Sequence, residues 1–227
     1  TVAANHAAGN YTVSVGYRSC ETASTALGVT AVGAFSLQNN TAANNSAFGN
    51  NALLLNTTGT RNTAAGFGAL ATQTTTNDNS AFGYNALTLA TGTQNAAFGS
   101  GTLAANTTGA RNAAFGFGAL VTQTITSDNS AFGYNALTVN TGTQNAAFGS
   151  GAAAANTTGT RNAAFGFGAL GSTTLDDIVA VGYNAAGGTS GARVTAVGSG
   201  AGNGASGDDN VYIGYNAGNG AAGATFN

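Results

Sequence analysis

The sequence predicts an all-β fold, a parallel β-solenoid, and three observations support this class. A glycine recurs at steps of 16 or 17 residues, alternating polar and apolar side chains precede most of these glycines, and Gly, Asn and Thr separate the alternating stretches. A fixed period of this kind is typical of proteins whose repeats bury apolar surface by stacking on one another. We expect about 13 coils, because the recurring glycines are Gly16, Gly33, Gly49, Gly66, Gly83, Gly99, Gly116, Gly133, Gly149, Gly166, Gly182, Gly198 and Gly214.

The stretch before each glycine indicates a strand rather than a helix. In residues 79–82 polar and apolar side chains alternate with period two, and the stretch is too short for a typical helix. We expect a corner at Tyr84 and Asn85, a second strand over residues 86–89, and another corner at residues 106–109 of the next coil. Gly and Asn suit such corners because they tolerate a positive φ angle.

A longer period divides the chain into three parts. The sequence from Asn45 to about Asn95 is nearly repeated fifty residues later, and a third copy begins at Asn145. We predict irregular N-terminal coils over residues 1–44, regular repeats over residues 45–170 and Gly-rich, thinner coils over residues 171–227. Because the copies are nearly identical, no copy holds a unique chemical site.

The composition disfavours several classes of protein. Lys and Arg number 5, Asp and Glu number 7, and the net charge is −2, so no basic surface for nucleic acid is expected. No apolar run reaches the roughly 18 residues of a membrane-spanning helix, so no membrane insertion is expected. A disordered linker is disfavoured because 43% of the residues are apolar and they recur in phase. The chain begins at Thr1 without a Met, and we expect it to be processed or part of a longer protein.

Most of the charged residues fall in one column, five residues before each recurring glycine. Equal positions of successive coils lie about 4.8 Å apart in a parallel solenoid, so an Arg is expected beside an Asp or a Gln. We predict that this column fixes the register between coils. Its members are Arg61, Asp78, Gln94, Arg111, Asp128, Gln144, Arg161, Asp177, Arg193 and Asp209.

The next column is occupied by asparagine in eight successive coils. Stacked amides can hydrogen-bond along the coil axis, and this ladder is the expectation. The alternative is a polar stripe that binds sugars. The column consists of Asn45, Asn62, Asn79, Asn95, Asn112, Asn129, Asn145 and Asn162.

Two columns supply large apolar side chains, and we expect both to fill the inside of each coil. They are the residue before the glycine and the fourth residue after it. Both become smaller after Gly171, where we expect the coils to be thinner or to be supported differently. The predicted core residues are Phe82, Phe98, Phe115, Phe132, Leu87, Leu103, Leu120 and Leu137. The residue two before the glycine is almost always Ala, which indicates close approach of a backbone, either of a neighbouring subunit or inside the coil.

Strings such as residues 79–87 (NSAFGYNAL), 195–201 (TAVGSGA) and 211–218 (VYIGYNAG) carry a family resemblance. They resemble the head repeats of YadA-like trimeric autotransporter adhesins. They resemble more closely the fibre regions of bacterial and phage proteins that precede an S74-type intramolecular chaperone domain. The resemblance spans about residues 11–218 and implies a left-handed parallel β-roll, a homotrimer, and an extracellular location on a virion or cell surface.

No constellation of catalytic residues is evident. The single histidine, His6, lies outside the regular repeats, and the single cysteine, Cys20, cannot form an intrachain disulfide and suits a buried position. A calcium site at residues 176–177 and 208–209 is disfavoured because Arg193 stands between the two aspartate pairs in the same column. We therefore expect no enzyme activity, metal or cofactor.

These observations favour a structural or adhesive fibre shaft, from a phage tail fibre or a bacterial surface adhesin. The expected partner is the chain itself, as a homo-oligomer and most simply a trimer, with a host-surface glycan or receptor as a further candidate. A self-assembling filament of chains joined end to end is the alternative. An ice-binding solenoid is less favoured, because the threonines cluster in turns. Asn56, Asn106 and Asn156 begin sequons for N-glycosylation, yet the same Asn-Thr-Thr-Gly sequence also favours a turn.

Overall fold

A computed structural model describes residues 12–22 and 27–221 and confirms the predicted parallel β-solenoid. The described residues form strands and turns and contain no helix. The chain divides into two compact units, residues 1–112 and 113–227. This boundary lies within the predicted regular region 45–170, and the three-part division by sequence remains a prediction.

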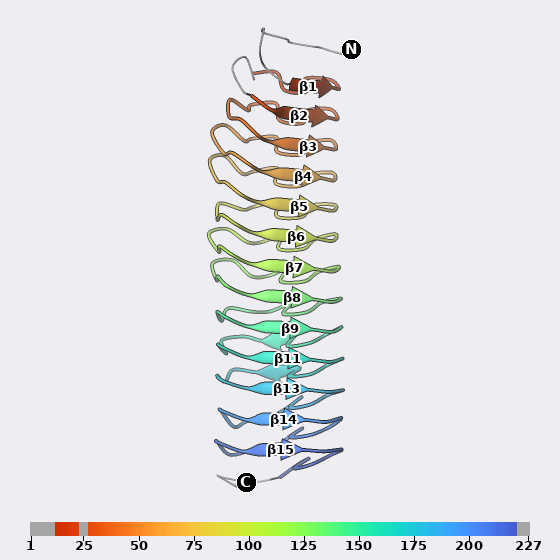
Figure 1. The fold of residues 1–227 in the computed structure, drawn as a ribbon, viewed down its shortest axis with the longest axis vertical. Helices are drawn as coiled ribbons and strands as arrows, with labels where there is room; N and C mark the ends of the chain where they lie inside the picture. The colour runs from red at the N-terminus through yellow and green to blue at the C-terminus, as the bar shows by residue number, and fades with distance from the viewer. Residues whose placement is uncertain (1–11, 23–26, 222–227) are drawn as a thin grey trace. The chain divides into compact units, whose positions relative to one another are not determined.

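The first unit contains six parallel strands in chain order (Figure 1). They are β1 (Thr12–Val15), β2 (Val29–Val32), β3 (Ser46–Phe48), β4 (Thr63–Ala65), β5 (Ser80–Phe82) and β6 (Ala96–Phe98). Equal repeat positions are paired, as Ala64 is with Ala81 and Ala81 with Ala97. The register is therefore the one that the glycine period predicts.

The second unit contains seven strands in the same parallel arrangement. They are β7 (Ala113–Phe115), β8 (Ser130–Phe132), β9 (Ala146–Phe148), β11 (Ala163–Phe165), β13 (Val179–Val181), β14 (Thr195–Val197) and β15 (Val211–Ile213). A separate two-stranded parallel sheet is formed by β10 (Ala155–Asn156) and β12 (Ser172–Thr173).

The prediction of a second strand in each coil is wrong for most of the described coils. These coils have turns after the recurring glycine instead. In the coil that follows β4, the Ala69 amide donates to the Gly66 carbonyl and the Ala71 amide donates to the Gly68 carbonyl, so two turns overlap. Gly68 and Leu70 have φ angles of 66° and 51°, which interrupt an extended backbone. The ladder between coils nevertheless continues through these turns.

The leucine column lies inside the coils, as predicted. Leu87, Leu103, Leu120 and Leu137 are completely buried. The alanine column is buried as well. Its close contacts therefore lie inside the coil, which agrees with the interpretation of crowding within the coil rather than contact with a neighbouring subunit. Its buried members are Ala31, Ala47, Ala64, Ala81, Ala97, Ala114, Ala131, Ala147, Ala164, Ala180 and Ala196.

The phenylalanine column is not part of the interior, and this prediction is wrong. Phe82 is 37% exposed. Phe98, Phe115 and Phe132 are half-buried. Successive side chains of a strand point to opposite faces, so the buried alanine in the middle of each strand forces the following phenylalanine outward.

The interior of the last coils is filled differently from that of the regular coils, which agrees with one of the two expectations for residues 171–227. The leucine column changes to Ala186, Gly202 and Gly218, and the Tyr212 side chain enters the interior there from the strand side. Ile178 and Val194 are also buried, in the column that asparagine occupies in the regular coils. A Cβ atom placed on Gly218 would lie 2.0 Å from the Tyr212 ring. The aromatic side chain thus takes the volume that leucine fills in the regular coils.

Candidate functional site

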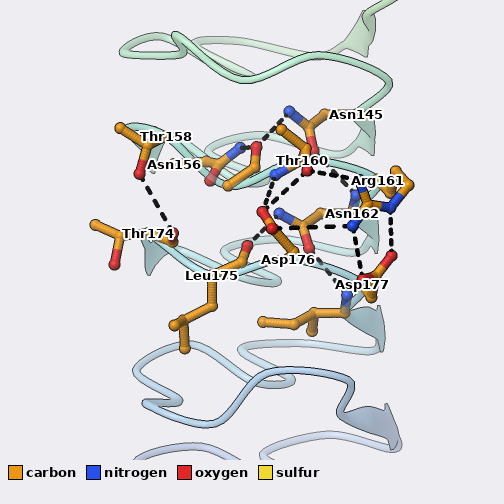
Figure 2. Close-up of polar contacts among 12 residues, drawn as sticks. Asn145, Asn156, Thr158, Thr160, Arg161, Asn162, Thr174, Leu175, Asp176 and Asp177 are labelled. Atoms are coloured by element: carbon orange, nitrogen blue, oxygen red, sulfur yellow. Dashed lines mark hydrogen bonds and ion pairs between the residues drawn. The ribbon is translucent and has the colours of Figure 1, made fainter.

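The predicted charge column forms ion pairs between successive coils. In the first unit, Arg61 Nε and Asp78 Oδ1 are 2.6 Å apart, and Arg61 Nη2 donates to Asp78 Oδ2 at 2.9 Å. In the second unit, Arg161 makes the same two-point contact with Asp177 at 2.6 and 2.8 Å (Figure 2). Arg193 Nη2 donates to Asp209 Oδ2 at 2.9 Å. The alternation of Arg and Asp in the sequence therefore places opposite charges in contact in successive coils.

The remaining members of the charge column share its backbone conformation. All of them have φ angles between 55° and 63°, so each charged or amide side chain projects from a left-handed corner. Such a corner favours short polar side chains but tolerates arginine here. These members are Gln94, Arg111, Asp128 and Gln144.

Hydrogen bonds from the arginines hold the pKa values of Asp78, Asp177 and Asp209 below their usual range. A carboxylate with a lowered folded-state pKa stabilises the fold above its unfolded pKa, and this contribution disappears as the pH falls through the folded value. We predict a melting temperature that is nearly constant from neutral pH to about pH 5 and then falls below about pH 4. Circular dichroism melts across this range measure it.

The matched control is a triple substitution of Asp78→Asn, Asp177→Asn and Asp209→Asn. It removes the three titrating partners and keeps a side chain that tolerates a positive φ angle. The triple variant should lose less melting temperature on acidification than the wild type does. An equal loss in both proteins would show that other carboxyl groups govern the acid response.

The asparagine column forms a buried ladder, which confirms the amide interpretation. Asn145 Oδ1 accepts a hydrogen bond from the Asn162 amide at 3.0 Å, and Asn145 Nδ2 donates to the Gly159 carbonyl at 2.8 Å (Figure 2). The same pattern occurs in the first unit, where Asn62 Oδ1 accepts from the Asn79 amide at 3.0 Å. All eight side chains are at most 2% exposed, so the alternative of a sugar-binding stripe is wrong.

The first aspartate of each pair, Asp176 and Asp208, accepts a hydrogen bond from the backbone of the preceding coil. Asp176 Oδ1 accepts hydrogen bonds from the amide and the hydroxyl of Thr160 at 2.8 and 2.9 Å (Figure 2). Asp208 Oδ1 accepts from the Ala192 amide at 2.9 Å, and Asp208 also contacts Arg193. Residues 12–22 and 27–221 contain no group of three or more side chains placed to hold a metal ion.

The sequon asparagines are buried. Asn56, Asn106 and Asn156 have no exposed surface, and each donates from Nδ2 to the glycine carbonyl three residues later. These hydrogen bonds close the Asn-Thr-Thr-Gly corner, in agreement with the turn interpretation. Cys20 is buried too, which raises its pKa to about 11 and keeps the thiol protonated. His6 lies outside the described residues.

The threonines that follow the buried amides are aligned from coil to coil. The Thr57 hydroxyl donates to the Thr74 carbonyl at 2.9 Å, and the Thr141 hydroxyl donates to the Thr157 carbonyl at 2.6 Å. These hydroxyl hydrogens are used between coils rather than offered to solvent. This use gives no support to the ice-binding alternative.

Two outward-facing columns carry most of the exposed large apolar side chains in the described part of the chain. We define the strand-face column as the residue before each recurring glycine and the corner column as the residue after it. In the strand-face column, the rings of Phe132 and Phe148 are stacked 4.7 Å apart at 4°, and those of Phe148 and Phe165 are 5.0 Å apart at 5°. In the corner column, Phe67 and Tyr84 are stacked 5.5 Å apart at 13°.

The strand-face column was identified from the sequence, but its rings were predicted to lie inside the coil. In the first unit, the exposed or half-buried members of the strand-face column are Val15, Val32, Phe48, Ala65, Phe82 and Phe98. In the second unit they are Phe115, Phe132, Phe148, Phe165, Val181, Val197 and Ile213. No family model, curated protein or solved structure matches this chain. No helix in the described part of the chain is long and apolar enough to cross a membrane.

Proposed function

We propose that this chain is a non-catalytic, homo-oligomeric shaft of an extracellular fibre, from a phage tail fibre or a bacterial surface adhesin. The observation that carries the proposal is the strand-face column, a continuous apolar row within each unit on the outside of a folded solenoid. Exposed apolar patches of this extent are typical of surfaces that bind another protein. The family resemblance supports a trimer and an extracellular location.

The stacking of the rings indicates which kind of partner the strand-face column suits. Phe132 and Phe165 cover the two faces of the Phe148 ring, so Phe148 presents an edge to the outside. A ring edge packs well between the apolar side chains of another protein surface. A flat ligand that stacks on an aromatic face finds no free face in the middle of this column. A second copy of the chain offers the required surface of the same chemistry and spacing.

The mass of the intact protein at micromolar concentration tests this proposal. We expect a single mass of three chains by native mass spectrometry and light scattering. Replacing Phe132, Phe148 and Phe165 with Thr should yield monomers that keep the β spectrum, because threonine suits a strand. The control variant Phe117→Thr and Phe167→Thr, in the corner column, should keep the wild-type mass.

Two results would argue against the proposed assembly. A stable, soluble wild-type monomer would refute self-association through the strand-face column. A series of masses that grows with concentration would favour the end-to-end filament over the closed oligomer. Variants that remain oligomeric would place the interface on another face.

A further inference from the structure

The corner column of the second unit is interrupted at Ser150, and this interruption leaves two aromatic faces uncovered. Phe117 and Tyr134 are stacked 5.7 Å apart at 11°, and Phe167 and Tyr183 are stacked 5.6 Å apart at 10°. Phe117 covers one face of Tyr134, and Tyr183 covers one face of Phe167. Their other faces are directed toward the coil of Ser150, where the side chain is short. We call the space between Tyr134 and Phe167 the corner notch.

The floor of the corner notch is open as well. Elsewhere in this unit an asparagine from the next coil fills the space beside a corner glycine, as Asn135 Oδ1 does at Gly118 and Asn184 Oδ1 does at Gly168. Gly151 differs, because a Cβ atom placed on it would have nothing within 4 Å. The residue at the equivalent position of the next coil is Gly168, which has no side chain to fill the space.

The width of the notch selects the kind of ring that fits. Tyr134 and Phe167 are two coils apart, so their ring planes are about 9.6 Å apart if each coil rises about 4.8 Å. A planar aromatic ligand in contact with both faces fills only about 7–8 Å. A saturated six-membered ring is thicker, because it is puckered and carries C–H bonds on both faces. The slot therefore suits a sugar ring.

The polar groups of the notch also fit a neutral sugar. No hydrogen bond within the described part of the chain engages the Ser150 hydroxyl, and Ser150 is half-buried at the floor. The Tyr134 side chain is 57% exposed. The charged side chains of this unit lie in or beside the charge column rather than at the corner, so nothing in the notch would attract or balance an ionic ligand.

We propose that the corner notch between Tyr134 and Phe167 binds one neutral hexopyranose unit of a polysaccharide. The two ring faces would hold the sugar by C–H contacts, and Ser150 would exchange hydrogen bonds with its hydroxyl groups. The proposal depends on the proposed extracellular role only for the source of the ligand. The residues of the notch floor recur at Ser100 and Gly101, and a Cβ atom on Gly101 also meets nothing within 4 Å.

Saturation-transfer NMR with cellohexaose, laminarihexaose, maltohexaose and chitohexaose tests the proposal on the intact chain. We expect at least one of these neutral oligosaccharides to bind with a dissociation constant of about 1 mM or lower. The paired substitution Gly168→Asn and Asn184→Gly moves an amide into the notch without changing the composition. Both positions have positive φ angles, 62° and 49°, which Asn and Gly tolerate.

The paired substitution should reduce the saturation-transfer signal by about half or more, because it fills the corner notch and leaves open only the similar floor at Ser100 and Gly101. Tyr134→Ala should do the same, whereas Asn184→Gly alone, which leaves the notch open, should retain wild-type binding. Melting curves verify that each variant is folded, and native mass spectrometry on the same samples separates a failure of the proposed assembly from a failure of binding. The proposal is overturned if none of the four oligosaccharides binds. It is equally overturned if only a planar aromatic probe or the polyanion heparin binds, or if the paired substitution leaves binding unchanged.

Discussion

Replacing Gly149 with alanine should lower the free energy of unfolding by at least about 4 kcal/mol, which places it among the most damaging single substitutions in this chain. Gly149 has a φ angle of 139°, a conformation that residues with a Cβ atom rarely adopt. The added Cβ atom would lie 2.5 Å from the Gly166 carbonyl oxygen of the next coil. Neither backbone can yield without breaking the ladder between coils. Thermal melts should show a decrease of roughly 8–16 °C.

Gly151→Ala is the matched control, because it adds the same methyl group two residues away in the same coil. Its φ angle of 67° is in the left-handed region, yet the added Cβ atom would meet nothing within 4 Å. We expect a loss of about 1–2 kcal/mol from the backbone conformation alone. If the two substitutions lowered the melting temperature equally, contact between the backbones of successive coils would not explain the period of the recurring glycines.

The period of the glycines was enough to predict the architecture, because the same contact repeats in every coil. A Cβ atom on Gly66 would lie 2.3 Å from the Gly83 carbonyl oxygen, so the glycine marks where one coil lies directly on the next. The alternation of Arg61 and Asp78 likewise predicted their pairing, because parallel strands place equal positions side by side. Both inferences depend only on register.

Which face of the strand is inside could not be predicted from hydrophobicity. Phe82 is larger and more apolar than Ala81, yet Ala81 is buried and Phe82 is 37% exposed. The interior is narrow at the strand because Leu87 and its equivalents already fill it from the turn side, and a strand can direct only one of two adjacent residues inward. Each apolar column taken alone suits the interior of the coil, but the interior is too narrow to hold both the phenylalanine and the leucine side chains.

The turn conformation of the second segment was hidden for a different reason. Leu70 and Leu87 have φ angles of 51°, a left-handed conformation that leucine seldom adopts. Nothing in their residue type indicates it, and tertiary packing imposes it. The corner notch was equally hidden, because it depends on a missing side chain at Gly168 rather than on one that is present. Only the spatial neighbours of Gly151 reveal it.

Replacing Asn145 with alanine should have the second large effect, a loss of about 2–6 kcal/mol in the free energy of unfolding. The Asn145 side chain accepts from the Asn162 amide and donates to the Gly159 carbonyl. Its removal leaves the Asn162 amide without a partner in a place where only 2% of the Asn145 surface is exposed. The Gly159 carbonyl loses one of its two donors and keeps the hydrogen bond from Asn156. The unsatisfied buried amide costs about 1–3 kcal/mol, and the two other lost hydrogen bonds, to the Gly159 carbonyl and to Asn140 Oδ1, cost about 0.5–1.5 kcal/mol each. Melting curves should show a decrease of roughly 4–24 °C.

Two further variants separate the lost hydrogen bonds from other causes. Asn145→Leu restores volume but supplies no polar atom, so it should not recover the stability lost in Asn145→Ala. Gln144→Asn changes the adjacent exposed side chain at a φ angle of 60°, which asparagine tolerates, and should leave the melting temperature nearly unchanged. Recovery by leucine would mean that the ladder acts by filling space. In that case the hydrogen bonds of the buried amides would not stabilise the stacking of coils. Apolar side chains could then replace these amides throughout the regular repeats.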